Sequence, residues 1–245
     1  MEELVSIIMP AHNCQRLIGE SIRSVVAQTY RDWELLVVDD CSTDDTARVV
    51  RNADDSRIRY SRLDKNSGAA AARNAALKQA NGRYVAFLDA DDMWKRDKLE
   101  LQLRFMSEHN IGFSFSAYEI VKGSQTKVVN VPSRLNYSQF MKNTIIGTST
   151  VVLDRRIIGD VEMVNVRQDH DSMTWAKILR QGHLAYGLNR SLAYYRKRAG
   201  SLSSDKLRAA RIHWRNCRKI EGLSTPRCLY YFVFYSVNAV KKHYL

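Results

Sequence analysis

The chain is 245 residues long, and its composition, 45% hydrophobic and 26% charged, is ordinary for a globular protein. One large domain or two small ones fit this length, whereas disordered, collagen-like and low-complexity chains are excluded. The formal net charge of +12 is concentrated at the end of the chain, because residues 190–245 carry 13 Lys/Arg against 2 Asp/Glu. A basic tail of this kind can meet nucleic acid or an anionic membrane surface.

The four cysteines form no Cys-x-x-Cys pair, and no Cys/His cluster has the spacing of a zinc site. Reduced thiols in a cytoplasmic protein are therefore expected. The N-terminus, Met1-Glu2-Glu3, is acidic and leads directly into an apolar run, which is unlike a signal peptide.

Residues 4–88 alternate between short apolar runs, typical of buried strands, and helix-forming segments. The apolar runs cover residues 4–9, 33–38, 58–60 and 84–88, and the helical segments cover residues 17–26, 44–50 and 68–80. Pro10 is expected to stop the first strand, Asn13 to cap the first helix, and Ser42 or Thr43 to cap the second. This alternation predicts βαβ units and a mainly parallel sheet.

Polar residues follow three of these strands, at the edge where a parallel sheet binds its ligands. They are Pro10-Ala11-His12-Asn13, Asp39-Asp40 and Asp89-Ala90-Asp91-Asp92. Three carboxylates within four residues repel one another, and a bound Mg²⁺ or Mn²⁺ would hold them together; the alternative is a solvated acidic turn that caps the next helix. No Gly-x-Gly-x-x-Gly or Gly-x-x-x-x-Gly-Lys loop follows the first strand, which disfavours a dehydrogenase-type dinucleotide site and a P-loop.

Further along the chain, an amphipathic helix is expected over residues 95–108. Strands are expected at residues 113–121, 126–131 and 148–153. A further helix opens at Gln168-Asp169-His170-Asp171 and ends at Gln181-Gly182. Taken alone, a carboxylate such as Asp169 at a helix start is either a cap or a functional group.

The tail predicts a basic helix over residues 204–219, a break at Thr225-Pro226, and an aromatic-rich helical run over residues 229–240. A helix needs about 20 apolar residues to span a bilayer, so this run is too short to cross but suits a helix in the membrane interface. The alternative is that its aromatic residues pack on the catalytic domain or on a twin subunit. Those residues are Tyr230, Tyr231, Phe232 and Phe234.

Four segments, in this order and spacing, resemble the family 2 inverting glycosyltransferases of the GT-A fold: residues 5–13, 34–44, 66–74 and 82–92. The resemblance implies an α/β fold with a Rossmann-like, mainly parallel sheet flanked by helices. It implies a glycosyltransferase domain at 1–203, with a nucleotide-sugar-binding half at 1–110 and an acceptor-binding half at 111–203. The basic, aromatic tail at 204–245 follows as a helical, membrane-associating segment.

The resemblance also implies transfer of a sugar from a nucleoside diphosphate, typically UDP, to an acceptor hydroxyl with inversion. Asp39 would accept the uracil N3–H, Asp89 would lie near the ribose, and Asp91 would ligate Mn²⁺ or Mg²⁺ on the diphosphate. Arg73 looks like the family arginine at the nucleotide, the alternative being a salt bridge on a helix surface. The donor-binding residues implied in this way are Pro10, Ala11, His12, Asn13, Asp39, Arg73, Asp89, Ala90 and Asp91.

By the same resemblance, Gln168-Asp169-His170-Asp171 stands where the family usually shows Glu-Asp-x-Asp, which makes Asp169 the general base and Asp171 a secondary candidate. Residues 192–203 are similar to the segment that closes over the donor diphosphate, with Arg198 in place of the common His. An arginine cannot ligate the metal but can pair with phosphates, so Arg196 or Arg198 is expected at the diphosphate. The alternative is a basic, solvated loop.

These features predict a metal-dependent glycosyltransferase of bacterial surface-polysaccharide assembly (lipopolysaccharide, capsule or exopolysaccharide). We expect it on the cytoplasmic face of the cell membrane, with a glycan or lipid-linked acceptor and without nucleic acid. A nucleotidyltransferase is one rival, and it would need a Gly-rich loop with Lys or Arg after the first strand. A nucleic-acid-binding protein is another, and it leaves Asp39, Asp89 and Asp91 unexplained. The intact Asp91 and Asp169 disfavour an inactive homologue.

Overall fold

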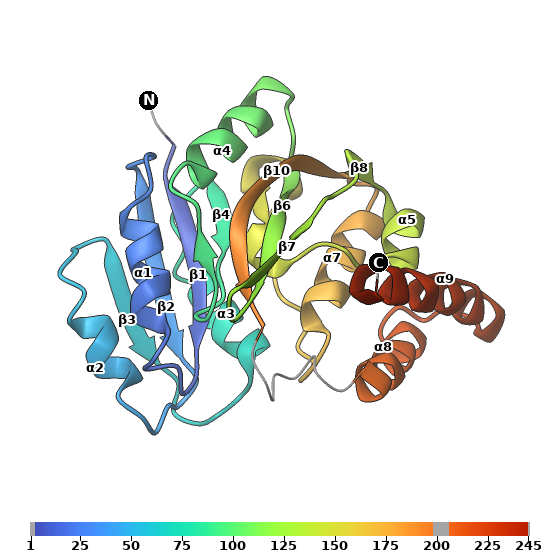
Figure 1. Ribbon diagram of the computed structural model, residues 1–245, viewed down its shortest axis with the longest axis horizontal. Helices are drawn as coiled ribbons and strands as arrows, with labels where there is room; N and C mark the ends of the chain where they lie inside the picture. Colours follow the sequence, from blue (N-terminus) through green and yellow to red (C-terminus); the bar gives the residue numbers. More distant parts are fainter. Residues whose placement is uncertain (1–2, 198–205, 245) are drawn as a thin grey trace.

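The computed structural model describes residues 3–197 and 206–244. Its centre is a ten-stranded sheet with the strand order β3-β2-β1-β4-β9-β6-β10-β5, in which β7 also pairs with β6 and β8 with β10. Helices lie on both faces of this sheet (Figure 1). The predicted α/β fold with a sheet flanked by helices is confirmed, and the sheet is mixed, because β9 runs antiparallel to both β4 and β6.

The strands are β1 (Val5–Ala11), β2 (Trp33–Asp39), β3 (Ile58–Arg62), β4 (Tyr84–Phe87), β5 (Met93–Trp94), β6 (Phe113–Lys122), β7 (Gln125–Val129), β8 (Arg134–Leu135), β9 (Val152–Asp154) and β10 (Ala185–Arg196). The helices are α1 (Ile18–Val26), α2 (Thr46–Arg51), α3 (Ala69–Leu77), α4 (Lys98–Glu108), α5 (Tyr137–Lys142), α6 (Arg155–Ile158), α7 (His170–Arg180), α8 (Lys206–Lys219) and α9 (Thr225–Tyr244), and a 3₁₀ turn, η1, covers Thr148–Thr150.

Each face of the sheet has its own hydrophobic core, because successive strand residues point to opposite faces. Ile8 of β1 packs in one core with the alanines of α3 and with Trp175 of α7. Its neighbours Ile7 and Met9 pack in the other core with α1 and α4. Trp175 contacts two strand phenylalanines edge-on and is fully buried. The sheet thus holds α3 and α7 together on one face.

The first strand does not stop at Pro10, as the sequence suggested, but continues to Ala11. In a parallel ladder the N–H and C=O of one residue point to the same side and alternate along the strand. The Ile8 carbonyl accepts a bond from Leu88, so Ile8 and Pro10 both point toward β4. Pairing with β4 ends at Ile8, so the missing N–H of Pro10 leaves no ladder bond unmade.

The predicted helix caps Asn13, Ser42 and Thr43 are wrong. Helix α1 begins at Ile18 after Leu17, and α2 begins at Thr46 after Asp45, in both cases without a side-chain cap. Instead, the N–H of Asn13 donates to Ser42 Oγ at 2.9 Å and the N–H of Thr43 donates to Asn13 Oδ1 at 2.8 Å. These polar residues therefore join the loops after β1 and β2.

Strands β1, β2, β4, β6 and β10 all run in the same direction. Strands β1, β2 and β4 pair in parallel, β6 returns to the direction of β4 through the antiparallel β9, and β10 pairs in parallel with β6. Their carboxyl ends therefore lie at one edge of the sheet. The loops after β1, β2 and β4 and the end of β10 meet there, at the lower edge in Figure 1.

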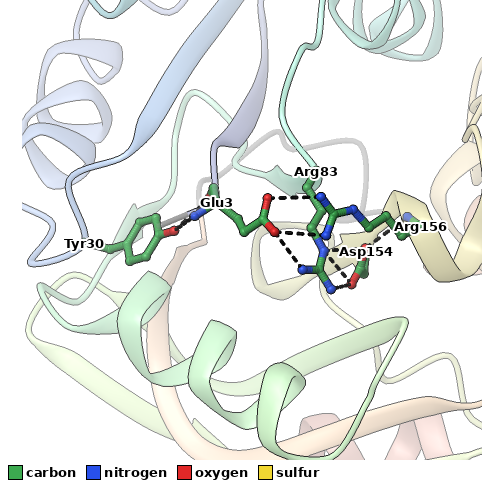
Figure 2. A network of polar contacts seen from close by, with 5 residues as sticks. All are labelled: Glu3, Tyr30, Arg83, Asp154 and Arg156. Carbon is green, nitrogen blue, oxygen red and sulfur yellow. Dashed lines mark hydrogen bonds and ion pairs between the residues drawn. The ribbon is translucent and has the colours of Figure 1, made fainter. Parts of the chain in front are cut away.

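The opposite edge is closed by an ion-pair network (Figure 2). Arg83, just before β4, donates to Asp154 at the end of β9 at 2.6 Å, and Glu3 accepts from both Arg83 and Arg156. A hollow of about 430 Å³ opens beside these residues. Because its guanidinium groups are already paired with carboxylates, this edge holds the strands in register and offers little free charge to a ligand.

The tail folds as two helices, of which α9 packs on α5 and on α8, beside the end of the sheet that is remote from α1 and α2 (Figure 1). On the inner side of α9, Tyr231 packs edge-on against Tyr137 of α5, and Phe232 packs against Trp214 of α8. On the outer side, Tyr230 and Phe234 are exposed. The aromatic run thus both packs on the protein and presents apolar surface. None of the helices in the described ranges combines the length and apolarity that a membrane crossing needs.

Candidate active site

Three carboxylates gather at the carboxyl end of β4. Asp89, Asp91 and Asp92 each place one carboxylate oxygen within 4.8 Å of the others. Asp89 and Asp91 are partly exposed, whereas Asp92 is 2% exposed. Hard oxygen ligands at this spacing suit Mg²⁺ or Mn²⁺ when other ligands complete the coordination shell. The helix-cap alternative does not apply, because the next helix, α4, begins only at Lys98.

Asp92 is more deeply buried than the other two carboxylates, and two hydrogen bonds hold its side chain. Its Oδ2 accepts a bond from Ser149 Oγ at 2.6 Å, and its Oδ1 accepts one from the N–H of Arg196 at 3.1 Å. Burial, with the negative charges of Asp89 and Asp91 adding to it, raises the pKa of Asp92 well above its usual value. A cation bound at this cluster would offset that repulsion, so the donor set fits a divalent metal.

Arg73 joins this cluster to the start of α7. It lies on α3, is 4% exposed, and its guanidinium forms an ion pair with Asp89. The same guanidinium hydrogen-bonds His170 Nε2. A guanidinium only donates, so Nε2 is the accepting nitrogen and the ring proton is on Nδ1. Burial and the positive charge of Arg73 lower the pKa of His170, which keeps the ring neutral.

The helix that carries Arg73 is fixed by Asp40, the residue after β2. Its carboxylate accepts the N–H groups of Ser67 at 2.6 Å and of Gly68 at 2.8 Å, just before α3 begins. Gly68 has φ +91°, a conformation in which glycine carries no Cβ penalty. The Asn66-Ser67-Gly68 segment therefore turns the chain so that α3 points Arg73 at Asp89.

Asp169 comes directly before α7 and has a left-handed backbone, with φ 63°. Its side chain does not cap the helix. Oδ2 accepts a bond from His213 Nδ1 of α8 at 2.8 Å, whereas Oδ1 accepts none from the described residues. Within the part of the chain that the structure describes, Asp169 is therefore bonded through one oxygen.

Asp171, the second residue of α7, is bonded through both oxygens. It accepts from the Thr148 hydroxyl at 3.0 Å and from the N–H of Ser172 at 2.9 Å. Burial opposes its ionisation, but the neighbouring His170 ring, the positive charge of Arg73 and these two bonds together hold the pKa of Asp171 below its usual range. A carboxylate with a lowered pKa and no free oxygen is a poor proton acceptor.

Asp39 reaches the same edge but faces the protein interior. It is fully buried, and it accepts bonds from the Tyr60 hydroxyl at 2.7 Å and from the N–H of Ser42 at 2.8 Å. Burial and the neighbouring Asp39 carboxylate raise the pKa of Tyr60 to about 12, so the hydroxyl stays a donor. Asp39 thereby holds the loop at residues 40–43, and its bond to a uracil N3–H stays a prediction.

The remaining predicted donor residues lie at the ends of β1 and β4. Pro10 is partly exposed and Ala11 buried, His12 and Asn13 are exposed, and the buried Ala90 accepts a bond from Ser21 Oγ at 2.9 Å through its carbonyl. Exposed polar groups next to the carboxylate cluster thus come from the loop after β1.

Arg196, which was predicted at the diphosphate, is bonded to other groups of the protein. Its guanidinium forms an ion pair with Glu20 of α1 and hydrogen-bonds the carbonyls of Asp91 and Leu17. These contacts tie the end of β10 to α1 and to the loop that carries Asp91. The contact of Arg196 with a diphosphate stays a prediction. Arg198, the other predicted residue, lies outside the described residues.

Three contributors to this edge were not expected from the sequence: Ser149 below Asp92, His170 beside Arg73, and His213 on Asp169. Ser149 lies in the Thr-Ser-Thr segment that we expected to be strand, and this segment is instead the 3₁₀ turn η1. His213 lies 44 positions from its partner. No local pattern in the basic helix could have found it.

The sequence model described as "Glycosyl transferase family 2" matches residues 6–158, more than half of the chain. The chain belongs to glycosyltransferase family 2. The matched residues include the loops after β1, β2 and β4, Arg73 and the Asp89–Asp91–Asp92 cluster. Asp169 and the tail lie beyond them. A nucleotidyltransferase is therefore set aside as the activity of this chain.

Curated relatives of this glycosyltransferase match over nearly its whole length. TuaG of Bacillus subtilis, named for teichuronic acid biosynthesis, is 46% identical over 98% of this chain and 97% of its own. WfgD of Escherichia coli is 40% identical over 98% of this chain and 95% of its own, and its name is UDP-Glc:alpha-D-GlcNAc-diphosphoundecaprenol beta-1,3-glucosyltransferase. These relatives place the family 2 chain in cell-surface polysaccharide biosynthesis.

Solved structures share the fold. Staphylococcus aureus TarS 1–349 in complex with UDP-GlcNAc aligns with a TM-score of 0.72 at 22% identity, over 100% of this chain and 76% of that one. The Pyrobaculum calidifontis mannosyltransferase PcManGT, in complex with GDP-Man and Mn²⁺, aligns with a TM-score of 0.70 at 20% identity, over 99% and 76%. At these identities the likeness confirms the glycosyltransferase fold alone.

The raised pKa of Asp92 predicts a pH dependence of stability in the metal-free enzyme. The unfolded carboxyl ionises near pH 3.9, whereas the folded one holds its proton to higher pH. The folded state therefore binds more protons in this window, so the free energy of unfolding falls as the pH rises through it. We expect Asp92→Asn, which keeps an acceptor for Ser149, to flatten this fall.

Urea unfolding in EDTA, measured between about pH 4.5 and 7.5 on both proteins, checks this pH dependence. Asp54→Asn, at an exposed position far from the cluster, is the matched control and should retain the wild-type slope. Identical slopes in wild type and Asp92→Asn would show that Asp92 ionises normally.

Proposed function

We propose that this glycosyltransferase moves a sugar from a UDP-sugar to a hydroxyl of a lipid-diphosphate-linked acceptor, with inversion and with the help of a divalent metal. The observation that carries the proposal is the link through Arg73: one buried guanidinium joins the Asp89 end of the carboxylate cluster to the residue next to Asp169. The carboxylate cluster proposed for the metal and the diphosphate is thereby held at the same edge of the sheet as Asp169, whose Oδ1 accepts no bond from the described residues.

In this proposal Asp91 holds Mn²⁺ or Mg²⁺, Asp89 lies on the ribose side, and Asp92 supports both from below. When bound, the metal offsets the negative charge that develops on the departing diphosphate. Support comes from the donor set itself, three carboxylates with oxygens within 4.8 Å, and from the Mn²⁺ in the complex of PcManGT. The exposed His12 and Asn13 and the loop held by Asp39 face the nucleoside.

Asp169 is the proposed general base, and the choice over Asp171 rests on bonding. Oδ1 of Asp169 accepts no bond from the described residues and can take a proton, whereas both oxygens of Asp171 are already bonded. The acceptor hydroxyl gives its proton to Oδ1, and its oxygen bonds to the sugar C1 from the face opposite the nucleotide. The bond from C1 to the diphosphate oxygen breaks, and its electron pair leaves with UDP.

The names of two relatives support the proposed donor and acceptor classes. WfgD and WfaP of Escherichia coli carry names that specify UDP-Glc as donor and GlcNAc-diphosphoundecaprenol as acceptor. The β-linkage in those names, formed from the α-linked glucose of UDP-glucose, is an inversion at C1. Identity of 38–40% over 98% of the chain supports the same classes here.

A lipid-linked acceptor stays anchored in the bilayer, so the enzyme has to act at the membrane surface. The outer side of α9 carries an apolar stripe at helical spacing: Leu229, Tyr230, Val233, Phe234 and Val237, each 42–55% exposed. Lys142 of α5 lies over the rings of Tyr230 and Phe234, at 4.9 and 5.1 Å from their centroids. An apolar helix face beside cationic side chains suits the interface of an anionic membrane, and we propose peripheral attachment at the cytoplasmic face.

Removal of the Asp91 carboxylate should abolish the Mn²⁺-dependent part of UDP binding, because the metal loses its principal protein ligand. Isothermal titration calorimetry with UDP, in Mn²⁺ and in EDTA, measures this for wild type and Asp91→Ala. Asp54→Ala, an exposed aspartate away from the site, is the control. UDP affinity that is the same in Mn²⁺ and EDTA, in wild type as in the variant, would refute the metal assignment.

Asp169→Asn should bind the donor normally but lose turnover by roughly 10²–10⁴-fold, the range typical of general-base removal. The readout is UDP release from UDP-glucose with a synthetic GlcNAc-diphosphate lipid as acceptor, together with UDP affinity by calorimetry. Asp171→Asn serves as comparison and should keep more activity. Undiminished turnover in Asp169→Asn means that the base lies elsewhere.

A charge in the apolar stripe should weaken membrane attachment. Val233→Asp is expected to reduce binding to phosphatidylglycerol-containing vesicles by roughly tenfold, because it places a carboxylate against anionic headgroups. The control is Val128→Asp on β7, where the valine is 50% exposed against 53% for Val233. Vesicle co-sedimentation measures both, and equal binding of the two variants would favour another partner for the stripe.

A further inference from the structure

Two side-chain bonds tie α8 of the tail to the segment just before α7. His213 Nδ1 bonds Asp169 Oδ2 at 2.8 Å, and Asn216 Nδ2 donates to the carbonyl of Gln168 at 3.1 Å. His213 and Asn216 are three positions apart on one face of α8, and each is 4% exposed. Buried polar groups that reach across 44 and 48 positions of sequence fix the position of both the backbone and the carboxylate of this segment.

The contact of the second ring nitrogen, Nε2, indicates that His213 is the donor in the bond to Asp169. Cys217 Sγ lies 3.5 Å from His213 Nε2. Burial, reinforced by Cys228 and nearby carboxylates, raises the pKa of the Cys217 thiol, so its sulfur keeps the proton. The S–H can then donate to Nε2, which leaves the ring proton on Nδ1, facing Asp169.

The plane of the imidazole is set by the second tail helix. Tyr235 of α9 stacks on His213 with ring centroids 4.4 Å apart and an interplanar angle of 18°. Tyr235 is on the inner side of α9, away from the apolar stripe. Three residues therefore define the imidazole. Cys217 of α8 and Tyr235 of α9 orient it, and Asp169, directly before α7, accepts a hydrogen bond from it.

We propose that His213 is a positioning residue for Asp169, and that α8 and α9 are thereby part of the catalytic unit. The inference rests on the proposed role of Asp169 as general base. Asp169 has φ 63°, a conformation that is uncommon for a residue with a Cβ, and its bond to His213 fixes the direction of its side chain. By holding Oδ2, His213 leaves Oδ1 directed to the acceptor hydroxyl.

The test compares two substitutions in the full chain. His213→Phe keeps a ring on Tyr235 but has no N–H, whereas His213→Asn keeps an N–H donor near the place of Nδ1. We expect His213→Phe to lower kcat by about 10–100-fold, a range seen when a partner that orients a functional group is lost, with KM for UDP-glucose unchanged. His213→Asn should restore most of the rate. His109→Phe, at an exposed histidine of the C-terminal end of α4, is the control.

A double substitution separates positioning from general damage to the tail. If His213 acts through the Asp169 carboxylate, Asp169→Asn with His213→Phe should be no slower than Asp169→Asn alone. A further loss in the double variant, or wild-type kcat in His213→Phe, would overturn the inference while Asp169 remains the base. Full activity of Asp169→Asn would instead overturn the proposed base.

A measurement without substrate covers the case in which His213→Phe does not fold. The ring nitrogens of ¹⁵N-histidine-labelled wild type report the tautomer directly by NMR. We expect His213 to carry its proton on Nδ1 and to show a shifted Nδ1 resonance in Asp169→Asn. A proton on Nε2 alone would exclude the bond to Asp169 and overturn the inference.

Discussion

The geometry of this site depends on one buried cation. Arg73 is 4% exposed, and its guanidinium forms an ion pair with Asp89 and a hydrogen bond with His170. A buried charge that loses a partner costs about 3–5 kcal/mol, so neither partner can move away without a large penalty. One of them belongs to the carboxylate loop after β4 and the other to α7, which holds the proposed donor and acceptor sides at a fixed spacing.

Sequence reasoning succeeded where the signal is contiguous. The β4 run and the carboxylates that follow it occupy nine adjacent residues, 84–92, and their order along the chain fixes which sheet edge they reach. The helix with Arg73 was found in the same way, from an alanine-rich segment bounded by Gly68 and by Asn81-Gly82. Family membership added the activity, which no single motif here establishes.

Prediction from the sequence failed where the role of a side chain depends on a partner that is distant in the sequence. Asn13 and Ser42 have the right chemistry for helix caps, yet each bonds the other's loop, because tertiary hydrogen bonds outweigh local propensity. Strand β10 was not expected at all, and its pairing with β6 shifts register twice between Leu188 and Ala193, which blurs the period-two pattern. His213 belongs to the same class: its role exists only through the fold.

Two opposite sides of helix α9 have different roles in this proposal, and they are about one helix diameter apart, roughly 10 Å. One side carries the apolar stripe. The other carries Tyr235, which stacks on the imidazole of His213, the hydrogen-bond partner of Asp169. If the stripe lies in the headgroup layer, the helix acts as a spacer of fixed thickness between the bilayer and the base. Such a spacer would select acceptors by the distance of the sugar from the membrane surface. A sugar linked to its lipid through a diphosphate would reach Asp169, whereas a sugar attached directly at the membrane surface would not.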